Sequence, residues 1–554
     1  MFYICIVFFW KEPKKFMELR NDTIGGLLEK WNRETPEKDF IIYPDRNIRW
    51  TYRQFNDRVD LFAKGLMELG VEKDSKVGIW ANNIPDWLTV FFASAKLGAW
   101  LVTVNTSYKA AELDYLLEDS DIHTLCIIDH YRDSDYIDMV NNLDRNHLPY
   151  LKNIVVMDGS DGRGYLTAED VFEKGRKAND LRYLRMKDAV DCQDIVNMQY
   201  TSGTTGFPKG VMLTHYNIIN NGQATGDAMN YSPADNLLVC VPFFHCFGIV
   251  LAVCAVITHN MTMTITVDFE AEAVLRAIHK ERCTSLYGVP TMYVAELSHE
   301  NFSKYDLSSL RTGIMAGSLC PIETMRQVMD KMYMKDIISV YGLTESSPGM
   351  TCSRIGHTVE QRATTVGTEF PFVEVKVFNP ETKKECKVGE QGEICCRGYN
   401  IMKGYYKNAK ATAETIDADG WLHSGDLAMK DADGFYHITG RIKDMIIRGG
   451  ENIYPREIEN FLYKMQGVKM VEVVGIPDAK YGEIVGAFII TNDGVELTQE
   501  QVQDFCRGQI ARYKIPKYIF FVDDYPKTGS GKVQKFKLRE MAKQRVDEIL
   551  AQQA

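Results

Sequence analysis

The sequence predicts an α/β protein: a large N-terminal domain of several subdomains with covered β-sheets, then a small mobile α+β C-terminal domain. Helical and strand-like stretches alternate from Asp22 to about Val190. The clearest compositional break lies at 440–444, and the chain beyond it has strands and helices of its own. At 554 residues the chain is too long for one small domain and can bury a large core with room for a cleft.

The alternation is clearest in the first hundred residues. Residues 53–69 have helical spacing and residues 76–80 read as a short buried strand. The pattern repeats with a helical stretch at 86–97 and a strand-like stretch at 100–104. Such alternation is typical of an α/β architecture with a covered sheet. The sequence shows no internal repeat and no low-complexity tract.

The compositional break at 440–444 follows a strand-like stretch at 434–439 and predicts a second domain. Its expected elements are strands at 471–475 and 486–491 and helices at 455–465 and 498–510. Pro455 fits the first turn of a helix, where its missing N–H costs nothing. We therefore predict an N-terminal domain at 17–442 and a C-terminal domain at 443–554, with a hinge at Lys443.

The first sixteen residues are treated separately. Residues 2–10 are apolar, but this run is too short for a bilayer span, which needs about 20 residues. A secretory signal carries positive charge before its apolar run, whereas Lys11, Lys14 and Lys15 follow this one. We expect residues 1–16 to be an unstructured leader or a misassigned start, with Met17 as the true first residue. A weak membrane-surface tether is the alternative.

Composition limits the function classes. The net charge of −11 leaves no basic surplus for phosphate neutralisation, which argues against broad nucleic-acid binding. The 13 cysteines show no CxxC spacing and no metal-type Cys/His cluster, and the adjacent Cys395 and Cys396 suit neither a common disulfide nor a zinc site. An odd number of scattered thiols is typical of a reducing, cytoplasmic compartment, with the thiols as buried filler.

The strongest motif is YTSGTTGFPKG at 200–210. After Tyr200 it contains four aliphatic hydroxyls, three glycines and one lysine, Lys209. Glycines expose successive backbone N–H groups to an anion, and hydroxyls and a lysine add donors and charge for phosphate. A Walker-type loop would need Gly-Lys-Ser/Thr leading into a helix, but here strand-like residues lie on both sides. The motif predicts a phosphate-binding loop between two strands.

With this loop, the sequence resembles the adenylate-forming superfamily of acyl-CoA synthetases, luciferases and peptide-synthetase adenylation domains. The resemblance covers roughly residues 20–545. Four further motifs follow in the family's order: YGLTES at 341–346, SGD at 424–426, GRIKD at 440–444 and PKTGSGK at 526–532. The resemblance implies an AMP-forming acid–thiol ligase that uses ATP, Mg²⁺ and coenzyme A.

The resemblance also implies roles for individual residues. It places Glu345 on magnesium, which prefers carboxylate oxygen, and Thr344 near the α-phosphate; read alone, this pair could be a helix cap. It places Asp426 and Arg441 on the ribose, and Gly317 against adenine, although Gly317 could also be a plain turn glycine. The full set assigned to nucleotide and CoA is Thr201, Ser202, Gly203, Thr204, Thr205, Lys209, Gly317, Tyr341, Gly342, Asp426, Arg441, Gly449 and Gly450.

Lys532 is the expected catalytic cation, because carboxylate attack on the α-phosphate develops negative charge that a positioned lysine stabilises. Composition alone would also fit a solvated basic loop. For thioester formation, the resemblance implies that the C-terminal domain rotates about Lys443 and brings in the segment 448–454. Gly449 and Gly450 there lack side chains, so a pantetheine arm can pass beside the backbone.

Substrate choice is read from PFFHCFG at 242–248. His245 matches the family's gate near the substrate carboxylate, with a packed core histidine as the alternative. The segment has no carboxylate, so a buried amino-acid ammonium would lack a partner. Val289, Met292, Met315 and Gly317 suggest an apolar tunnel wall, although such residues are also ordinary core. A medium- or longer-chain fatty acid fits best, with an aromatic acid second.

Two other functions stay open at this point. The enzyme could load a carrier protein instead of free CoA, although no carrier domain follows residue 545. It could also be a catalytically dead binding protein, which the intact Thr204, Glu345, Asp426 and Lys532 argue against. The expected partners are the acid, ATP and CoA, without nucleic acid and with at most a peripheral membrane contact. The sequence leaves a homodimer open.

Overall fold

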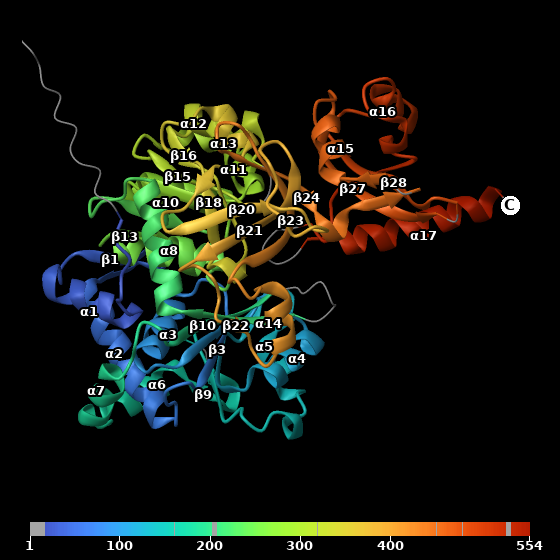
Figure 1. Cartoon of the computed structure of the whole chain (residues 1–554). Helices are drawn as coiled ribbons and strands as arrows, with labels where there is room; N and C mark the ends of the chain where they lie inside the picture. The colour runs from blue at the N-terminus through green and yellow to red at the C-terminus, as the bar shows by residue number, and fades with distance from the viewer. Residues whose placement is uncertain are drawn as a thin grey trace, which may run out of the picture.

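The structure is a computed structural model that describes residues 17–159, 161–201, 208–317, 320–449, 451–478, 480–527 and 533–553. The predicted leader therefore lies outside the described residues. The architecture is mixed α/β with several sheets, as the sequence predicts. A large N-terminal part holds most of the sheets, and a smaller C-terminal part, red in Figure 1, lies beside it.

An eight-stranded sheet forms the first half of the N-terminal part. Its strands, in spatial order, are β22 (Gly404–Tyr405), β11 (Lys209–Thr214), β10 (Ile195–Thr201), β4 (Trp100–Thr103), β3 (Lys76–Trp80), β5 (Ile122–Ile127), β8 (Asn153–Val156) and β9 (Leu166–Thr167). The strands from β10 to β9 pair in parallel, whereas β11 and β22 run antiparallel to their neighbours. Its helices are α2 (Tyr52–Glu68), α3 (Pro85–Lys96), α4 (Ala110–Ser120), α5 (Tyr136–Asn141), α6 (Ala168–Arg176) and α7 (Asp180–Asp188).

These elements confirm the predicted alternation. The helix predicted at 53–69 is α2, and its start is explained by Thr51, which forms a capping box with Gln54. The strand predicted at 76–80 is β3, and the helix predicted at 86–97 is α3, which has a proline in its first turn. Periodicity located these elements to within one residue because each has a buried face that repeats locally.

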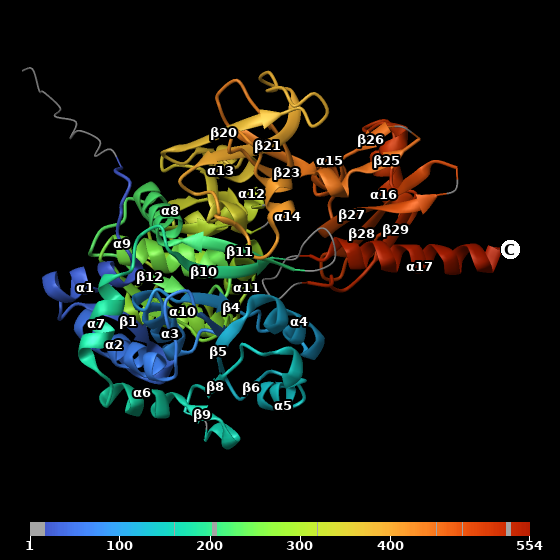
Figure 2. The same cartoon turned by 60° about the horizontal axis from the view of Figure 1, so that its bottom comes forward.

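A seven-stranded sheet forms the second half, next to the first (Figure 2). Its order is β16 (Asp336–Ile338), β15 (Thr312–Met315), β14 (Ser285–Gly288), β12 (Asn236–Val239), β13 (Thr262–Ile265), β1 (Asp39–Tyr43) and β2 (Ile48–Thr51). Its helices include α1 (Ile24–Glu34), α8 (His215–Ala228), the π-helix η4 (Phe247–Cys254), α9 (Ala255–Thr258), α10 (Ala271–Glu281), α11 (Pro290–Leu297) and α12 (Ile322–Lys331). One large hydrophobic core connects both sheets, and a second lies around α10 to α12.

Two smaller antiparallel sheets complete the N-terminal part. One contains β17 (Val340–Gly342), β18 (Gly349–Cys352) and β19 (Thr368–Glu369). The other contains β20 (Val373–Phe378), β21 (Gln391–Gly398), β23 (Leu422–Lys430) and β24 (Tyr436–Arg441). The accompanying helices are α13 (Val359–Thr364) and α14 (Ala409–Thr415). These sheets hold three of the predicted motifs, because YGLTES begins on β17, SGD lies on β23 and GRIKD begins on β24.

The C-terminal part has its own sheet and its own two hydrophobic clusters. Its strands are β25 (Ile446–Arg448), β26 (Glu451–Ile453), β27 (Val468–Asp478), β28 (Gly482–Thr491) and β29 (Tyr518–Phe521), with helices α15 (Pro455–Leu462), α16 (Gln499–Cys506) and α17 (Lys535–Gln553). Pro455 occupies the first turn of α15, as predicted. The separate clusters are consistent with an independent unit, and the domain boundary at Lys443 stays a prediction.

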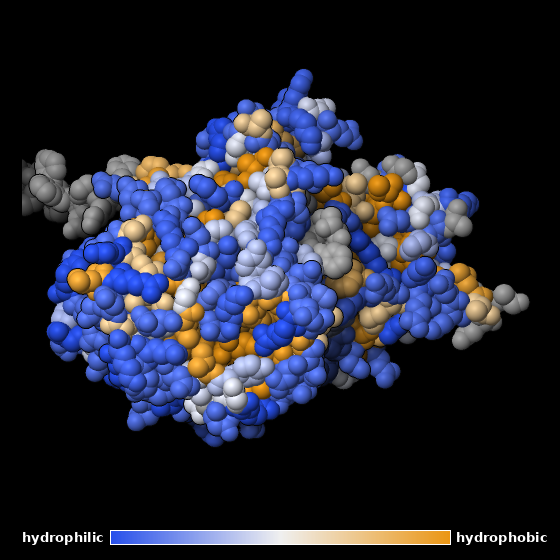
Figure 3. All heavy atoms as spheres, turned by 90° about the horizontal axis from the view of Figure 1, so that it is seen from below, coloured by the Kyte–Doolittle hydropathy of each residue, from blue (hydrophilic) through white to orange (hydrophobic). Residues whose placement is uncertain are grey.

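The surface is mainly hydrophilic on the face seen from below, with its broadest apolar area just below the middle and smaller ones elsewhere (Figure 3). In the described part of the chain, no helix has both the length and the apolar character that a membrane span requires.

Candidate active site

The predicted phosphate loop connects two antiparallel strands. β10 ends at Thr201, β11 begins at Lys209, and these two residues pair across the ladder. The chain therefore passes from strand to strand at this loop, as the sequence predicts, and not from strand to helix as in a Walker loop. The predicted site residues Ser202, Gly203, Thr204 and Thr205 lie outside the described residues.

A tyrosine connects Lys209 with Glu345. The Nζ atom of Lys209 lies 4.4 Å from the ring centroid of Tyr405, and the Tyr405 hydroxyl donates to Glu345 Oε1 at 2.8 Å. Burial, followed by the neighbouring Glu345 carboxylate, raises the pKa of Tyr405. The hydroxyl therefore stays protonated and orients the carboxylate. The sequence reasoning missed Tyr405.

The Thr344–Glu345 pair lies in a tight turn. Its residues form the short 3-10 helix η6 (Thr344–Ser346), in which Leu343 and not Thr344 takes the cap position. Gly342 has to be a glycine, because a Cβ there would lie 1.7 Å from the carbonyl oxygen of Pro348. Thr344 is buried, with Oγ1 3.8 Å from Cys246 Sγ. The turn thus brings Glu345 toward Tyr405 and Thr344 toward the His245 segment.

Asp426, Arg441 and Tyr341 come together between two sheets. Asp426 and Arg441 are direct partners on β23 and β24, with Asp426 Oδ1 3.1 Å from Arg441 Nε. The Tyr341 hydroxyl donates to Asp426 Oδ2 at 2.8 Å. Asp426 raises the pKa of Arg441, so the guanidinium stays charged. Gly425, at φ 72°, allows the turn that presents this carboxylate.

A narrow hollow lies beside His245. It is lined by Val241, Pro242, His245, Phe247, Val289, Met292 and Gly317, and its volume is about 30 Å³. Val289, Met292 and Gly317, three of the four residues predicted to form a tunnel wall, thus line the same hollow. The prediction for Met315 is wrong: this residue is fully buried in the second core cluster. It ends β15, and alternate strand residues point to opposite faces.

The hollow has an aromatic boundary and a positioned histidine. Phe247, the first residue of the π-helix, stacks on Tyr287 with ring centroids 5.7 Å apart. The backbone N–H of Phe247 donates to His245 Nδ1 at 3.2 Å. Nδ1 is therefore the acceptor of this ring, which leaves Nε2 to carry the proton of the neutral imidazole. π-Helical segments are frequent at functional sites.

The predicted CoA segment lies in the C-terminal part. Gly449, at φ 60°, turns the chain from β25 to β26, and its N–H donates to the Tyr481 carbonyl oxygen at 2.8 Å. Gly450 and Lys532 lie outside the described residues. The segment 448–454 approaches the nucleotide motifs at Tyr454. A Cβ atom added at Gly440 would lie 3.9 Å from the Cβ atom of Tyr454.

The predicted hinge residue follows directly after β24. Lys443 lies in the 3-10 turn η7 (Ile442–Asp444), and burial lowers the pKa of its amine. Arg539 of α17 donates to the Lys443 carbonyl oxygen at 3.3 Å and pairs with Asp444 at 3.0 Å. The last helix thus contacts the connection between the two parts.

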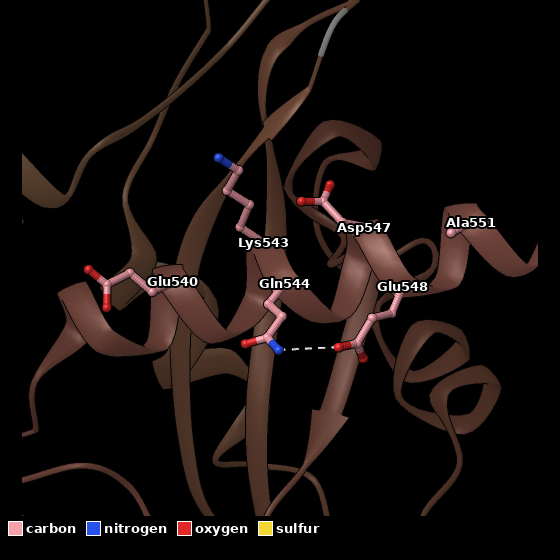
Figure 4. A pocket seen from close by; sticks show the side chains of 6 residues that line it. All are labelled: Glu540, Lys543, Gln544, Asp547, Glu548 and Ala551. Carbon is pink, nitrogen blue, oxygen red and sulfur yellow. Dashed lines mark hydrogen bonds between the residues drawn. The ribbon is translucent and has the colours of Figure 1, made fainter.

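A second, wider hollow lies over one face of α17 (Figure 4). All its lining residues belong to this helix: Glu540, Lys543, Gln544, Asp547, Glu548 and Ala551. None of the predicted site residues lies there. Small-molecule sites are concave and bury most of the ligand, which an open groove along a single helix does not do, so the hollow beside His245 is the better candidate for a substrate site.

The cysteines show one departure from the sequence analysis. All twelve described cysteines are free and most are buried, as expected for packing residues. However, Cys395 lies with Glu393 and His423 in a group whose ligand atoms are all within 4.8 Å of one another. Sequence spacing did not indicate this group, because its residues lie on two strands that pair only in the folded sheet.

The comparisons with known proteins agree with this geometry. The family model for AMP-binding enzymes matches residues 28–406, and that for the AMP-binding enzyme C-terminal domain matches residues 457–532. "Putative acyl-CoA synthetase YngI" of Bacillus subtilis (strain 168) is 49% identical over 535 residues, which cover 94% of this chain and 97% of that protein. The mitochondrial medium-chain acyl-CoA ligase ACSF2 of Bos taurus is 38% identical, with 96% and 89% covered.

A solved structure has the same fold over nearly the whole chain. The anthranilate CoA ligase AuaEII, in complex with anthranoyl-AMP, superimposes with a TM-score of 0.83 at 28% identity. The match covers 96% of this chain and 99% of that chain. The motifs, the fold and these relatives lead to one conclusion: the chain belongs to the family of AMP-binding, adenylate-forming enzymes, as an AMP-forming acid–CoA ligase.

Proposed function

We propose that this ligase activates medium- to long-chain fatty acids, with saturated acids of roughly C6 to C14 as the main substrates, since each buried methylene adds about 0.8 kcal/mol. The observation that supports this most is the lining of the hollow beside His245. His245 is its one ionisable residue, and the others are aliphatic, aromatic or glycine. The relative from Bos taurus is named a medium-chain acyl-CoA ligase.

The hollow must widen to accept such a chain. Its volume of about 30 Å³ holds one or two water molecules. Met292 is the wall best able to move, because Met is flexible, whereas the Phe247 ring is held by its stack on Tyr287. We therefore infer that the Phe247–Tyr287 stack limits chain length.

In the proposed first step, a carboxylate oxygen of the acid attacks the α-phosphorus of ATP. An acyl–phosphate bond forms, the bond to the leaving pyrophosphate breaks, and acyl-AMP remains. Asp426 would accept the ribose hydroxyls beside Arg441, while Lys209 and the 201–205 segment would bind phosphate. Lys532 would stabilise the charge that develops during the attack.

Mg²⁺ is proposed at Glu345. The carboxylate offers the hard oxygen ligands that this ion prefers, and the Tyr405 hydroxyl fixes one of them. When bound, the ion neutralises phosphate charge. Thr344, in the same turn, would contribute a hydroxyl near the α-phosphate.

In the proposed second step, the CoA thiol releases its proton to solvent and its sulfur attacks the acyl carbon. The thioester bond forms, the acyl–phosphate bond breaks, and AMP leaves. We infer that rotation about Lys443 brings Gly449 and Gly450 beside the pantetheine arm for this step. His245 would act as the gate next to the acyl carboxylate.

A cytoplasmic location is proposed because the described cysteines are all free.

An acid-dependent ATP–pyrophosphate exchange screen tests the substrate class. It compares saturated fatty acids of graded length, aromatic acids and amino acids, and then CoA with a carrier protein as acceptor. We expect exchange with fatty acids and transfer to CoA. The anthranilate ligase AuaEII makes aromatic acids the second candidate. Exchange with amino acids alone would refute the proposal.

The variant Phe247→Ala tests the length limit. Each methylene that the widened pocket accepts is worth about 0.8 kcal/mol, or roughly fourfold in kcat/KM. The preference for acids two methylenes longer should therefore rise by about tenfold or more. An unchanged length profile in a folded, active Phe247→Ala variant would show that the chain does not reach this ring.

A further inference from the structure

Three metal-ligating side chains meet on the paired strands β21 and β23. Glu393 and Cys395 are alternate residues of β21, and Cys395 is the direct partner of His423 on β23. The Nδ1 atom of His423 lies 2.8 Å from Glu393 Oε2 and 3.5 Å from Cys395 Sγ. In the described part of the chain, this is the one group of three or more potential ligands at such distances.

The donor set favours zinc over the magnesium proposed at Glu345. One sulfur, one imidazole nitrogen and one carboxylate oxygen suit Zn²⁺, whereas Mg²⁺ prefers oxygen alone. Bonds of about 2.0 Å to nitrogen and oxygen and about 2.3 Å to sulfur separate tetrahedral ligands by about 3.3 to 3.5 Å. The present distances of 2.8 Å and 3.5 Å therefore need only small side-chain movements.

The surroundings of these ligands resemble those of bound metals. Asp417 Oδ2 lies 3.4 Å from His423 Nε2, the ring nitrogen that faces away from Glu393 and Cys395. With a metal bound, such a carboxylate would hold the tautomer in which Nδ1 offers its lone pair to the ion. The other oxygen of Glu393 accepts a hydrogen bond from the backbone N–H of Gly425 at 2.9 Å. Glu393 and His423 thus each have a partner on the side that faces away from the proposed ion.

A single histidine is the ion-pair partner of both carboxylates beside this group. Glu393 and Cys395 are buried, at 6% and 0% exposure. Within the described residues, the ion pairs of Glu393 and Asp417 are with His423, and neither carboxylate has a lysine or arginine within 4.0 Å. Buried carboxylates are costly unless they are paired or bind a metal.

We propose that Glu393, Cys395 and His423 bind one Zn²⁺ ion that holds β21 to β23, with Asp417 positioning His423. His423 is partly exposed, so an ion and a water ligand can enter from its side. On binding, Zn²⁺ replaces the proton of the Cys395 thiol, which is released. The ion would tighten the Gly425 turn and with it the neighbouring Asp426.

The test titrates Co²⁺ into metal-stripped, full-length protein. A thiolate ligand gives a charge-transfer band in the near ultraviolet, and a tetrahedral site gives strong visible bands. We expect one Co²⁺ per chain with both features, and their loss when Zn²⁺ is added. Cys395→Ala should abolish the charge-transfer band. Cys396→Ala is the matched control, because this buried neighbour points to the opposite face of β21 and should leave the band unchanged.

A second variant keeps the test valid if Cys395→Ala fails to fold. Asp417→Asn changes a partly exposed residue outside the ligand set and should weaken Co²⁺ binding by about 10- to 100-fold while the band persists. The proposal is overturned if the wild type shows no charge-transfer band. It is equally overturned if the band survives in Cys395→Ala, which would assign it to another thiol such as Cys246 beside His245.

Discussion

Replacing Tyr405 by phenylalanine tests whether Glu345 works in nucleotide binding. The change removes one hydroxyl and keeps the ring that Lys209 faces at 4.4 Å. The lost hydrogen bond is 2.8 Å long and ends on a carboxylate, a type worth about 1.5 to 3 kcal/mol. That energy corresponds to roughly 10- to 100-fold in kcat/KM, the range found when a partner of a metal-ligating carboxylate is removed.

The assay is ATP–pyrophosphate exchange with a saturated fatty acid, measured over a series of Mg²⁺ concentrations. Tyr405→Phe should lower kcat/KM for MgATP and raise the Mg²⁺ concentration needed for half-maximal rate. Tyr406→Phe is the matched control. The adjacent Tyr406 hydroxyl donates to a different carboxylate, Asp121 Oδ2, at 2.7 Å.

Each variant removes one tyrosine hydroxyl from one carboxylate, Glu345 in the first and Asp121 in the second. Thermal melting of both checks that each remains folded. Equal activity of Tyr405→Phe, Tyr406→Phe and the wild type would refute the argument that Tyr405 positions Glu345. A loss of rate in Tyr405→Phe without any change in Mg²⁺ dependence would remove Glu345 from the metal site.

The other predictions concern the half-reactions and acid stability. Lys532→Ala should slow adenylate formation by about two orders of magnitude and retain thioester formation from supplied acyl-adenylate; an equal loss in both steps would count against domain alternation. Lys443→Pro should keep single-turnover adenylation within about tenfold and abolish CoA transfer, since proline fixes φ near −65°; equal retention of both rates would move the hinge elsewhere. Burial lowers the pKa of His215 to about 3, whereas an unfolded histidine has a pKa of about 6.5. The contribution of His215 to the free energy of unfolding is therefore complete above about pH 6.5 and is lost as the pH falls toward 3. His215→Asn keeps an acceptor for the Ile24 N–H and should flatten the fall of the urea midpoint below about pH 6.5; an unchanged slope would contradict this.

Local patterns predicted much of the fold. The helices and strands between residues 52 and 103 appear as expected, because amphipathic spacing and capping residues act within a few positions. The Asp426–Arg441 pair was also anticipated, through the order of motifs. The phosphate loop was correctly placed between strands, since the residues on both sides have strand character.

The rest depends on contacts between distant segments. Tyr405 was missed because its position beside Glu345 depends on the pairing of β22 with β11, where Tyr405 lies opposite Val211. No pattern in the sequence around Gly404 indicates that pairing. Met315 was misplaced because strand alternation decides which core it enters. No spacing in the sequence indicates the group of Glu393, Cys395 and His423, because β23 pairs with β21 only in the folded sheet.

The pairing of Asp426 with Arg441 has a mechanical consequence. Arg441 is the last residue of β24, and Lys443 follows it after one residue. A nucleotide bound at Asp426 would therefore restrain the strand that leads to Lys443, the proposed hinge. Departure of AMP would release this restraint at the same place. The C-terminal part would then respond directly to whether the nucleotide site is filled, without a signal that crosses the molecule.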